Sequence, residues 1–272
     1  MPSSISINTI WKRLHFDLFA MSLWNTNFRM MCFHGDIEGV RTALDNGADV
    51  NEATFNGGCT ALMWALHRHH NDVVQVLLNH PEIDVNIVDS PGGRSALHWA
   101  VNVVNHEGLQ VLLARPEIDV NKVDDLGRTP LHWAVNVANL EAVEALLARP
   151  ELDVNRDDGL GKSALHWAVT VANHEAIEVL LAHPDIDVNK VDGRGKSALH
   201  WAVTVDNHIG LEALLAQQHL TAINQTNFGG RSQIMHAVCY NKVNCFNLLL
   251  ANPRVDLETR EDFTRGPQEV LR

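Results

Sequence analysis

A seven-residue string that recurs along the chain constrains the fold more than any other feature. SALHWAV occurs at 95–101, 163–169 and 197–203, and the near-copy TPLHWAV occupies 129–135. A catalytic motif is needed once, whereas a structural unit can be needed many times. Because self-similarity at a fixed period is typical of repeat proteins, the sequence predicts an array of similar units.

The period of the array follows from two strings. The Ser or Thr that opens the first string recurs every 34 or 35 residues, at Thr60, Ser95, Thr129, Ser163, Ser197 and Ser232. The second string is DVN, found at 49–51, 84–86, 119–121, 153–155 and 187–189, with a degenerate AIN at 222–224. Since both strings keep one period, we expect one continuous array.

Each unit has the hydrophobic spacing of two short helices. Leu97 and Val101 lie four residues apart on the first, and Leu109 and Leu113 do so on the second. The opening Ser or Thr can cap the first helix, and Pro116 cannot continue the second. Turn sequences such as DGRGK separate the units. The unit is therefore expected to be a turn followed by two helices.

The motifs resemble those of the ankyrin repeat family. TPLHWA at 129–134 and GADVN at 47–51 match that family's strings, and six tandem copies extend over about residues 26–260. The resemblance implies an all-α solenoid of stacked helix-turn-helix units with hairpin-like turns between them. One departure is the string RPEIDVN or HPDIDVN, which replaces the shorter NGADVN and should lengthen the loop after the second helix.

The repeat pattern also predicts the domain organisation. Residues 1–25 are expected to form an apolar segment that caps the array, with a membrane-surface helix as the alternative. The array itself is expected over 26–262, followed by a tail at 263–272. Its expected boundaries are about 26–59, 60–94, 95–128, 129–162, 163–196, 197–231 and 232–262.

Aromatic residues recur at fixed places within the units. Tryptophan recurs at Trp64, Trp99, Trp133, Trp167 and Trp201. We expect these rings to be buried packing groups, with an aromatic ligand ladder as the alternative. The resemblance implies that His98, His132, His166 and His200 are the family's structural histidines, which bond backbone between neighbouring units.

Several features argue against an enzyme, a cofactor or a metal. GLGKS at 159–163 and GRGKS at 193–197 lack the earlier glycine of a phosphate-binding loop, because Arg156 and Lys190 stand there. His67, His69 and His70 are expected on a solvated face. No catalytic constellation follows from residue spacing, so we expect a non-catalytic protein without cofactor or metal.

Charge and composition limit the partners and the compartment. The formal net charge of −12 disfavours nucleic acid and anionic membranes. Charged residues interrupt the N-terminal apolar stretch, which predicts no secretory signal and favours a cytoplasmic protein, with the nucleus as the alternative. The four cysteines are expected to be reduced. We expect the protein by itself to be monomeric.

The resemblance implies that the partner is another protein, bound on the concave side of the array. The expected contacts from the ends of the first helices are Arg68, Asn102, Val103, Asn136, Val137, Thr170, Val171, Thr204, Val205 and Tyr240. Most of these are uncharged, which suits a peptide or a packed helix. In the alternative interpretation, the valines only support the turns.

A row of cations is expected at the turn tips. Arg94, Arg128, Lys162, Lys196 and Arg231 stand immediately before the capping Ser or Thr. Local pairing with Asp124, Asp158 and Asp192 is one interpretation, and attraction of an acidic partner surface or peptide is the other.

Two narrower roles follow from the resemblance. One is a substrate-recognition adaptor, for example in a ubiquitin-ligase or signalling complex. The other is hydroxylation of the DVN asparagines, because Asn121, Asn155 and Asn189 follow a leucine eight positions earlier. A turn asparagine that bonds its own backbone is the alternative to hydroxylation.

Overall fold

The structure, a computed structural model, describes residues 27–53 and 58–256. These residues fall into two compact units, one ending at Asp125 and one beginning at Leu126, and each is described by itself. Within the described ranges, extended pairing is limited to the isolated bridges Val88–Ser95 and Val191–Ser197. The expected all-α architecture of stacked helical repeats is confirmed.

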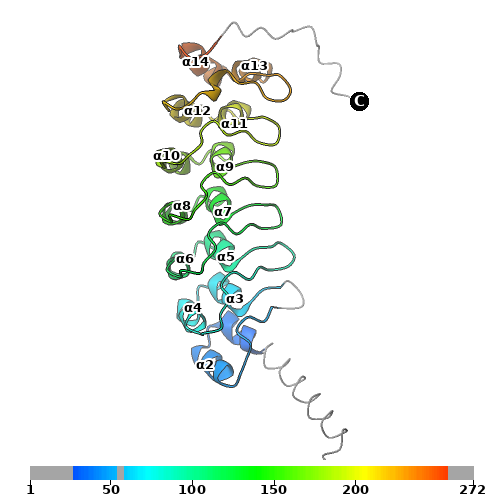
Figure 1. The fold of residues 1–272 in the computed structure, drawn as a ribbon, viewed down its shortest axis with the longest axis vertical. Helices are drawn as coiled ribbons and strands as arrows, with labels where there is room; N and C mark the ends of the chain where they lie inside the picture. Colours follow the sequence, from blue (N-terminus) through cyan, green and yellow to red (C-terminus); the bar gives the residue numbers. More distant parts are fainter. Residues whose placement is uncertain (1–26, 54–57, 257–272) are drawn as a thin grey trace, which may run out of the picture. The chain divides into compact units, whose positions relative to one another are not determined.

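Unit 1 contains two rows of helices. Its elements are a helical stretch at 27–34, α2 (Ile37–Asp45), α3 (Ala61–His67), α4 (Asn71–Leu78), α5 (Ala96–Asn102) and α6 (His106–Leu113). α3 packs beside α5, while α2, α4 and α6 pack in sequence (Figure 1). The expected cap at 1–25 lies outside the described residues and stays a prediction.

Unit 2 repeats the same arrangement. Its elements are α7 (Pro130–Asn136), α8 (Leu140–Leu147), α9 (Ala164–Thr170), α10 (His174–Ala182), α11 (Ala198–Val205), α12 (His208–Leu215), the 3₁₀ helix η1 (Ala222–Asn224), α13 (Gln233–Cys239) and α14 (Val243–Ala251). First helices α7, α9, α11 and α13 form one row, and second helices form the other. The hairpins extend from the first-helix row (Figure 1). The expected tail at 263–272 lies outside the described residues.

The helix starts are fixed by side-chain caps. The Thr129 hydroxyl accepts a bond from the His132 backbone N–H at the start of α7. Asn173 caps α10 by accepting from the Ala176 N–H, and its Nδ2 donates to the Val135 carbonyl of the preceding repeat at 3.1 Å. The second cap therefore also joins neighbouring repeats.

Stacking provides the hydrophobic core of each unit. In unit 2, Leu131, Leu146, Leu165 and Ile177 are fully buried. The helices have seven to nine residues, which is too short for stability in water without tertiary packing. The repeats therefore depend on their neighbours, and this regular stack sets the hairpins of unit 2 side by side.

Candidate partner-binding surface

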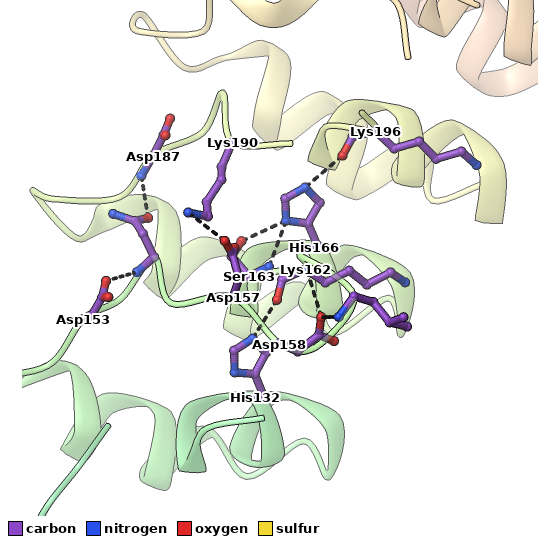
Figure 2. Close-up of polar contacts among 12 residues, drawn as sticks. His132, Asp153, Asp157, Asp158, Lys162, Ser163, His166, Asp187, Lys190 and Lys196 are labelled. Carbon is purple, nitrogen blue, oxygen red and sulfur yellow. Dashed lines mark hydrogen bonds and ion pairs between the residues drawn. The ribbon is translucent and has the colours of Figure 1, made fainter. Parts of the chain in front are cut away.

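Each long hairpin of unit 2 is organised by an aspartate at its base. Asp158 Oδ1 accepts from the backbone N–H groups of Leu160 and Lys162 at 2.8 and 2.9 Å. Asp192 makes the same pair of bonds within the next hairpin. Both carboxylates are buried, and Figure 2 shows Asp158 among its neighbours. Because a buried charge must be hydrogen-bonded, these donors fix the hairpin shape.

The same aspartates hold the tryptophans at the hairpin base. Trp167 Nε1 donates to Asp158 Oδ2, and Trp201 Nε1 donates to Asp192 Oδ2, each at 2.9 Å. The expectation of buried tryptophans is wrong in degree, because Trp64, Trp99, Trp133, Trp167 and Trp201 are all partly exposed. The indole N–H needs an acceptor, and the hairpin aspartate supplies one away from the helical core.

Basic side chains lie over the exposed parts of these rings. Lys162 Nζ is 3.4 Å and Lys196 Nζ is 4.7 Å from the centroid of the Trp201 ring. Arg128 lies over Trp133 with its guanidinium carbon 4.5 Å from the centroid. Local pairing thus takes the form of cation–π contacts, while the aspartates of the two lysine hairpins receive backbone N–H groups.

Unit 1 contains a similar cation–π contact, in which the cation is also paired with a carboxylate. Arg94 lies over Trp99, with the guanidinium carbon 4.6 Å from the ring centroid. The same guanidinium forms an ion pair with the buried Asp89 carboxylate at 2.7 Å. Asp89 also accepts from Trp99 Nε1 at 3.1 Å. Because its charge is compensated locally, Arg94 attracts an acidic partner less than an unpaired cation does.

The hairpin tips of unit 2 are exposed and joined to one another. Gly193 N–H donates to the Leu160 carbonyl at 2.9 Å, and Phe228 N–H donates to the Arg194 carbonyl at 3.1 Å. The side chains of Leu160 and Phe228 are 70% and 78% exposed. Exposed large apolar side chains on a fixed backbone are typical of interaction surfaces.

A pocket of about 430 Å³ lies between the hairpins that precede α9 and α11. It is lined by Gly159, Leu160, Gly161, Lys162, Asp192, Gly193, Arg194 and Trp201. Desolvation is the main cause that lowers the pKa of Lys162 and Lys196. The two side chains extend toward the same side of the unit (Figure 2).

Within unit 2, a first-helix end lies beside the lysine hairpins, because Lys196 Nζ is 3.4 Å from the Thr204 hydroxyl oxygen. Thr170 and Thr204 are partly buried, and each hydroxyl donates to a backbone carbonyl one turn earlier. The next residues, Val171 and Val205, are 40% and 38% exposed. The other expected contacts are accessible to different degrees: Val103 and Val137 are partly buried, and Arg68, Asn102, Asn136 and Tyr240 are exposed. None of these ten positions is fully buried, and their contact with a partner stays a prediction.

The histidines of the first helices have the same structural role in successive repeats. His132 Nε2 lies 2.9 Å from the Lys162 carbonyl, and its Nδ1 accepts from the Thr129 backbone N–H at 3.2 Å. Because Nδ1 is an acceptor, the proton is on Nε2, which donates to the next repeat. His166 and His200 repeat this bridge. The expected bonding of these histidines to the backbone of the neighbouring repeat is confirmed for His132, His166 and His200.

Burial favours the neutral form of His166 and His200. Desolvation lowers the pKa of His166 and lowers that of His200 to about 4. The carbonyl that His200 bonds belongs to Arg231, whose side chain is exposed. Each histidine therefore holds the backbone of the residue at a basic turn tip, so the cations are tied to the helical stack.

The DVN asparagines also bridge repeats. Asn155 Nδ2 donates to the Asp185 carbonyl at 2.6 Å, and Asn155 Oδ1 accepts from the Asp187 N–H at 2.8 Å. Asn189 bonds the following segment in the same way. The expected bond to the asparagine's own turn is thus replaced, for the side chains of Asn155 and Asn189, by bonds to the next repeat.

Neither a metal-binding cluster nor a membrane-spanning helix occurs in the described part of the chain. Within 27–53 and 58–256, no group of three or more His, Cys, Asp or Glu side chains is placed to hold a metal ion. In the same residues, no helix combines the length and the apolar character needed to cross a bilayer. His70, one of the three clustered histidines, contacts the Phe33 carbonyl through Nε2 at 3.0 Å.

Sequence reasoning missed the aspartate–tryptophan pairs and the pocket. The available signal was the spacing of nine residues between Asp158 and Trp167 and between Asp192 and Trp201. That spacing alone does not reveal that Lys162 reaches forward to Trp201, in the next repeat, because only stacking brings the two residues together.

Comparison with known proteins agrees with this architecture. A family model described as ankyrin repeats (3 copies) matches residues 28–124 and 105–192. Osteoclast-stimulating factor 1 from Rattus norvegicus and from Mus musculus is each 39% identical over 51 residues. That segment is 19% of this chain and 23% of each relative, so the similarity spans less than a quarter of their length.

Proposed function

Because the chain belongs to the ankyrin repeat family, whose repeats are general protein-interaction modules, we propose that it binds a partner protein through unit 2. The proposed surface, called the tip surface below, comprises Leu160, Lys162, Arg194, Lys196 and Phe228. The ends of the first helices, with Thr170, Val171, Thr204 and Val205, form its border. Arg231 and Tyr240 extend it toward α13, and Arg128 extends it in the other direction.

The observation that carries this proposal is the combination of charge and apolar exposure. Within the described residues, no ion pair involves the side chains of Lys162, Arg194 or Lys196, whereas Arg94 in unit 1 is paired. Leu160 and Phe228 are exposed beside these cations. A cationic surface on a chain with net charge −12 favours encounter with an acidic protein surface or peptide.

Charge reversal tests the proposal. We expect Lys162→Glu with Lys196→Glu to keep the helical stack folded, because neither side chain belongs to the buried apolar core. Loss of their contacts with Trp201 should cost about 0.5–1 kcal/mol each. Partner proteins captured from an extract on the parent protein should be lost on this variant. Their association should also slow most at low salt, where the Debye length reaches about 30 Å.

The matched control is a double charge reversal at two positions outside the tip surface. Arg156→Glu with Lys190→Glu alters the same net charge in unit 2, at an exposed arginine and at a lysine paired with Asp157. This variant should retain the partners of the parent. Identical capture by all three proteins, at every salt concentration, would exclude the tip surface as the binding site.

The two narrower roles remain predictions. An adaptor role would require that one captured partner be a component of a ubiquitin-ligase or signalling complex and that another bind at the same time. Hydroxylation would add one oxygen to Asn121, Asn155 or Asn189. Peptide mass spectrometry of the protein isolated from its own cells would detect that addition, and unmodified peptides at all three positions would contradict it.

A further inference from the structure

The pocket between the two lysine hairpins of unit 2 has an imbalance of charge. Lys162 and Arg194 line it together with Asp192, and Lys196 lies over the same Trp201 ring. Asp192 is 4% exposed, and its two oxygens already accept from the N–H groups of Arg194 and Lys196 and from Trp201 Nε1. Asp158, whose negative charge also acts on Lys162, accepts from the N–H groups of Leu160 and Lys162 and from Trp167 Nε1. Three cations thus lie beside two carboxylates whose oxygens are in use.

The cations are held in a partly dehydrated setting. Lys162 Nζ is 3.4 Å from the Trp201 centroid, and it forms no ion pair within the part of the chain that the structure describes. Burial lowers the pKa of Lys162; the charges of Asp192 and Asp158 oppose this, but the pKa stays lowered, and the positive charges of Lys196 and Arg194 add to the lowering. An anion in the pocket would relieve both effects, since an opposite charge at close range favours the protonated ammonium.

The backbone of the pocket has little to offer a phosphate. Leu160 and Lys162 N–H groups donate to Asp158, the Gly193 N–H donates to the Leu160 carbonyl, and the Arg194 N–H donates to Asp192. Phosphate-binding loops depend on unbonded backbone N–H groups that point at the ligand. Here recognition would come from side-chain cations alone, which suits a carboxylate.

Apolar groups at the rim favour a peptide over a free anion. Leu160 lines the pocket and is 70% exposed, and the Trp201 ring forms part of the wall. Phe228 is 78% exposed, and its ring lies against the Gly195 backbone, where an added Cβ would come within 2.5 Å of the ring. A free anion cannot use these surfaces, whereas a leucine or similar side chain next to the carboxylate can.

We propose that this pocket binds the carboxylate of an Asp or Glu side chain in a partner peptide, with a neighbouring aliphatic residue against Leu160 and Trp201. Lys162 and Arg194 would hold the carboxylate. The inference rests on the proposed function and names the feature of the partner that the tip surface recognises. A volume of about 430 Å³ lies within the range of about 300–1,000 Å³ that is usual for ligand pockets.

A titration with small probes tests the pocket without a known partner. The probes are N-acetyl-Asp-Leu-amide, the neutral N-acetyl-Asn-Leu-amide and inorganic phosphate. The signal is the indole N–H resonance of Trp201 in the ¹⁵N-labelled full chain, assigned by its disappearance in Trp201→Phe. We expect saturable shifts with Asp-Leu. Asn-Leu should bind at least about fivefold more weakly than Asp-Leu, because its neutral amide removes the charge pairing.

Charge-neutral variants locate the contact. Lys162→Gln and Arg194→Gln should each weaken Asp-Leu binding about fivefold, while Arg156→Gln, which removes an equal charge outside the pocket, should leave it unchanged. Lys162→Arg should retain most of the binding, because it keeps the charge. Circular dichroism identical to that of the parent would show that each variant is folded.

Three outcomes would overturn the inference. The first is no saturable shift of the Trp201 resonance with Asp-Leu, the second is equal binding of Asn-Leu, and the third is phosphate binding as tight as that of Asp-Leu. None of these results affects partner capture by the tip surface. If capture is lost in Lys162→Glu with Lys196→Glu while the probes fail, the pocket proposal is wrong and the proposed function stands.

Discussion

At the scale of single residues, the histidines of the first helices connect pH to stability. The imidazole of His200 is fully buried and neutral, and it bonds the Arg231 carbonyl. Its pKa is about 4 in the folded protein and near 6.5 when the chain is unfolded. Between these values the unfolded chain binds more protons, so stability is complete above pH 6.5 and falls as the pH drops toward 4.

We therefore expect His200→Gln to reduce the pH dependence of unfolding. Between pH 7.5 and 5, the parent should lose about 1–2 kcal/mol more of its free energy of unfolding than the variant, since one pKa unit corresponds to about 1.4 kcal/mol. Urea titrations followed by circular dichroism at both pH values would measure this difference.

The quantity compared is the change in the free energy of unfolding with pH, so a variant that is less stable at every pH does not affect the test. His219→Gln, at an exposed side chain, is the matched control and should retain the parent's pH dependence. Equal slopes in the parent, His200→Gln and His219→Gln would show that protonation of His200 does not contribute to acid unfolding.

At the scale of elements, the loop that contains each DVN asparagine is fixed by its neighbour in the next repeat. We expect Asn155→Ala to lower the free energy of unfolding by about 1–3 kcal/mol, because it removes two hydrogen bonds of about 1 kcal/mol each and leaves the Asp185 carbonyl and the Asp187 N–H without this partner. Chemical denaturation measures the loss.

A second asparagine of unit 2 provides the control. Asn136 lies at the exposed end of α7, and Asn136→Ala should change stability by no more than about 0.5 kcal/mol. If the two alanine variants are equally stable, the bridge from Asn155 to the next repeat contributes no stability.

At the scale of the whole molecule, stability should follow the number of packed neighbours. α9 packs against α7 and α11 as well as its partner α10, whereas α14 packs against α12 and α13. α10 buries Ala176, Ile177, Leu180 and Leu181, but α14 buries only Cys245 and Leu249. In repeat proteins, stability is approximately a sum of repeat and nearest-neighbour terms.

Amide hydrogen exchange should reveal this gradient. We expect the amides of α13 and α14 to exchange at least about tenfold faster than those of α9 and α10, because local opening exposes less apolar surface there. Exchange followed by mass spectrometry of peptides resolves these helices. Equal protection across α9–α14 would contradict a nearest-neighbour origin of stability within unit 2.

The sequence by itself determined the unit and its architecture. The period of 34 or 35 residues, the capping Ser or Thr and the helical spacing are local properties, and each recurs in enough copies to be read without coordinates. The bridging role of His132, His166 and His200 followed from the family resemblance.

Only the tertiary structure decided how the surface residues combine. Lys162 lies over Trp201, 39 positions later, because stacking sets successive hairpins side by side. The tryptophans lie at the hairpin bases because Asp158 and Asp192 accept their N–H groups. Such contacts depend on the rise from one repeat to the next. Hydrophobic periodicity records which face of a helix is buried, but it does not record this rise, so the pocket was absent from the sequence pattern.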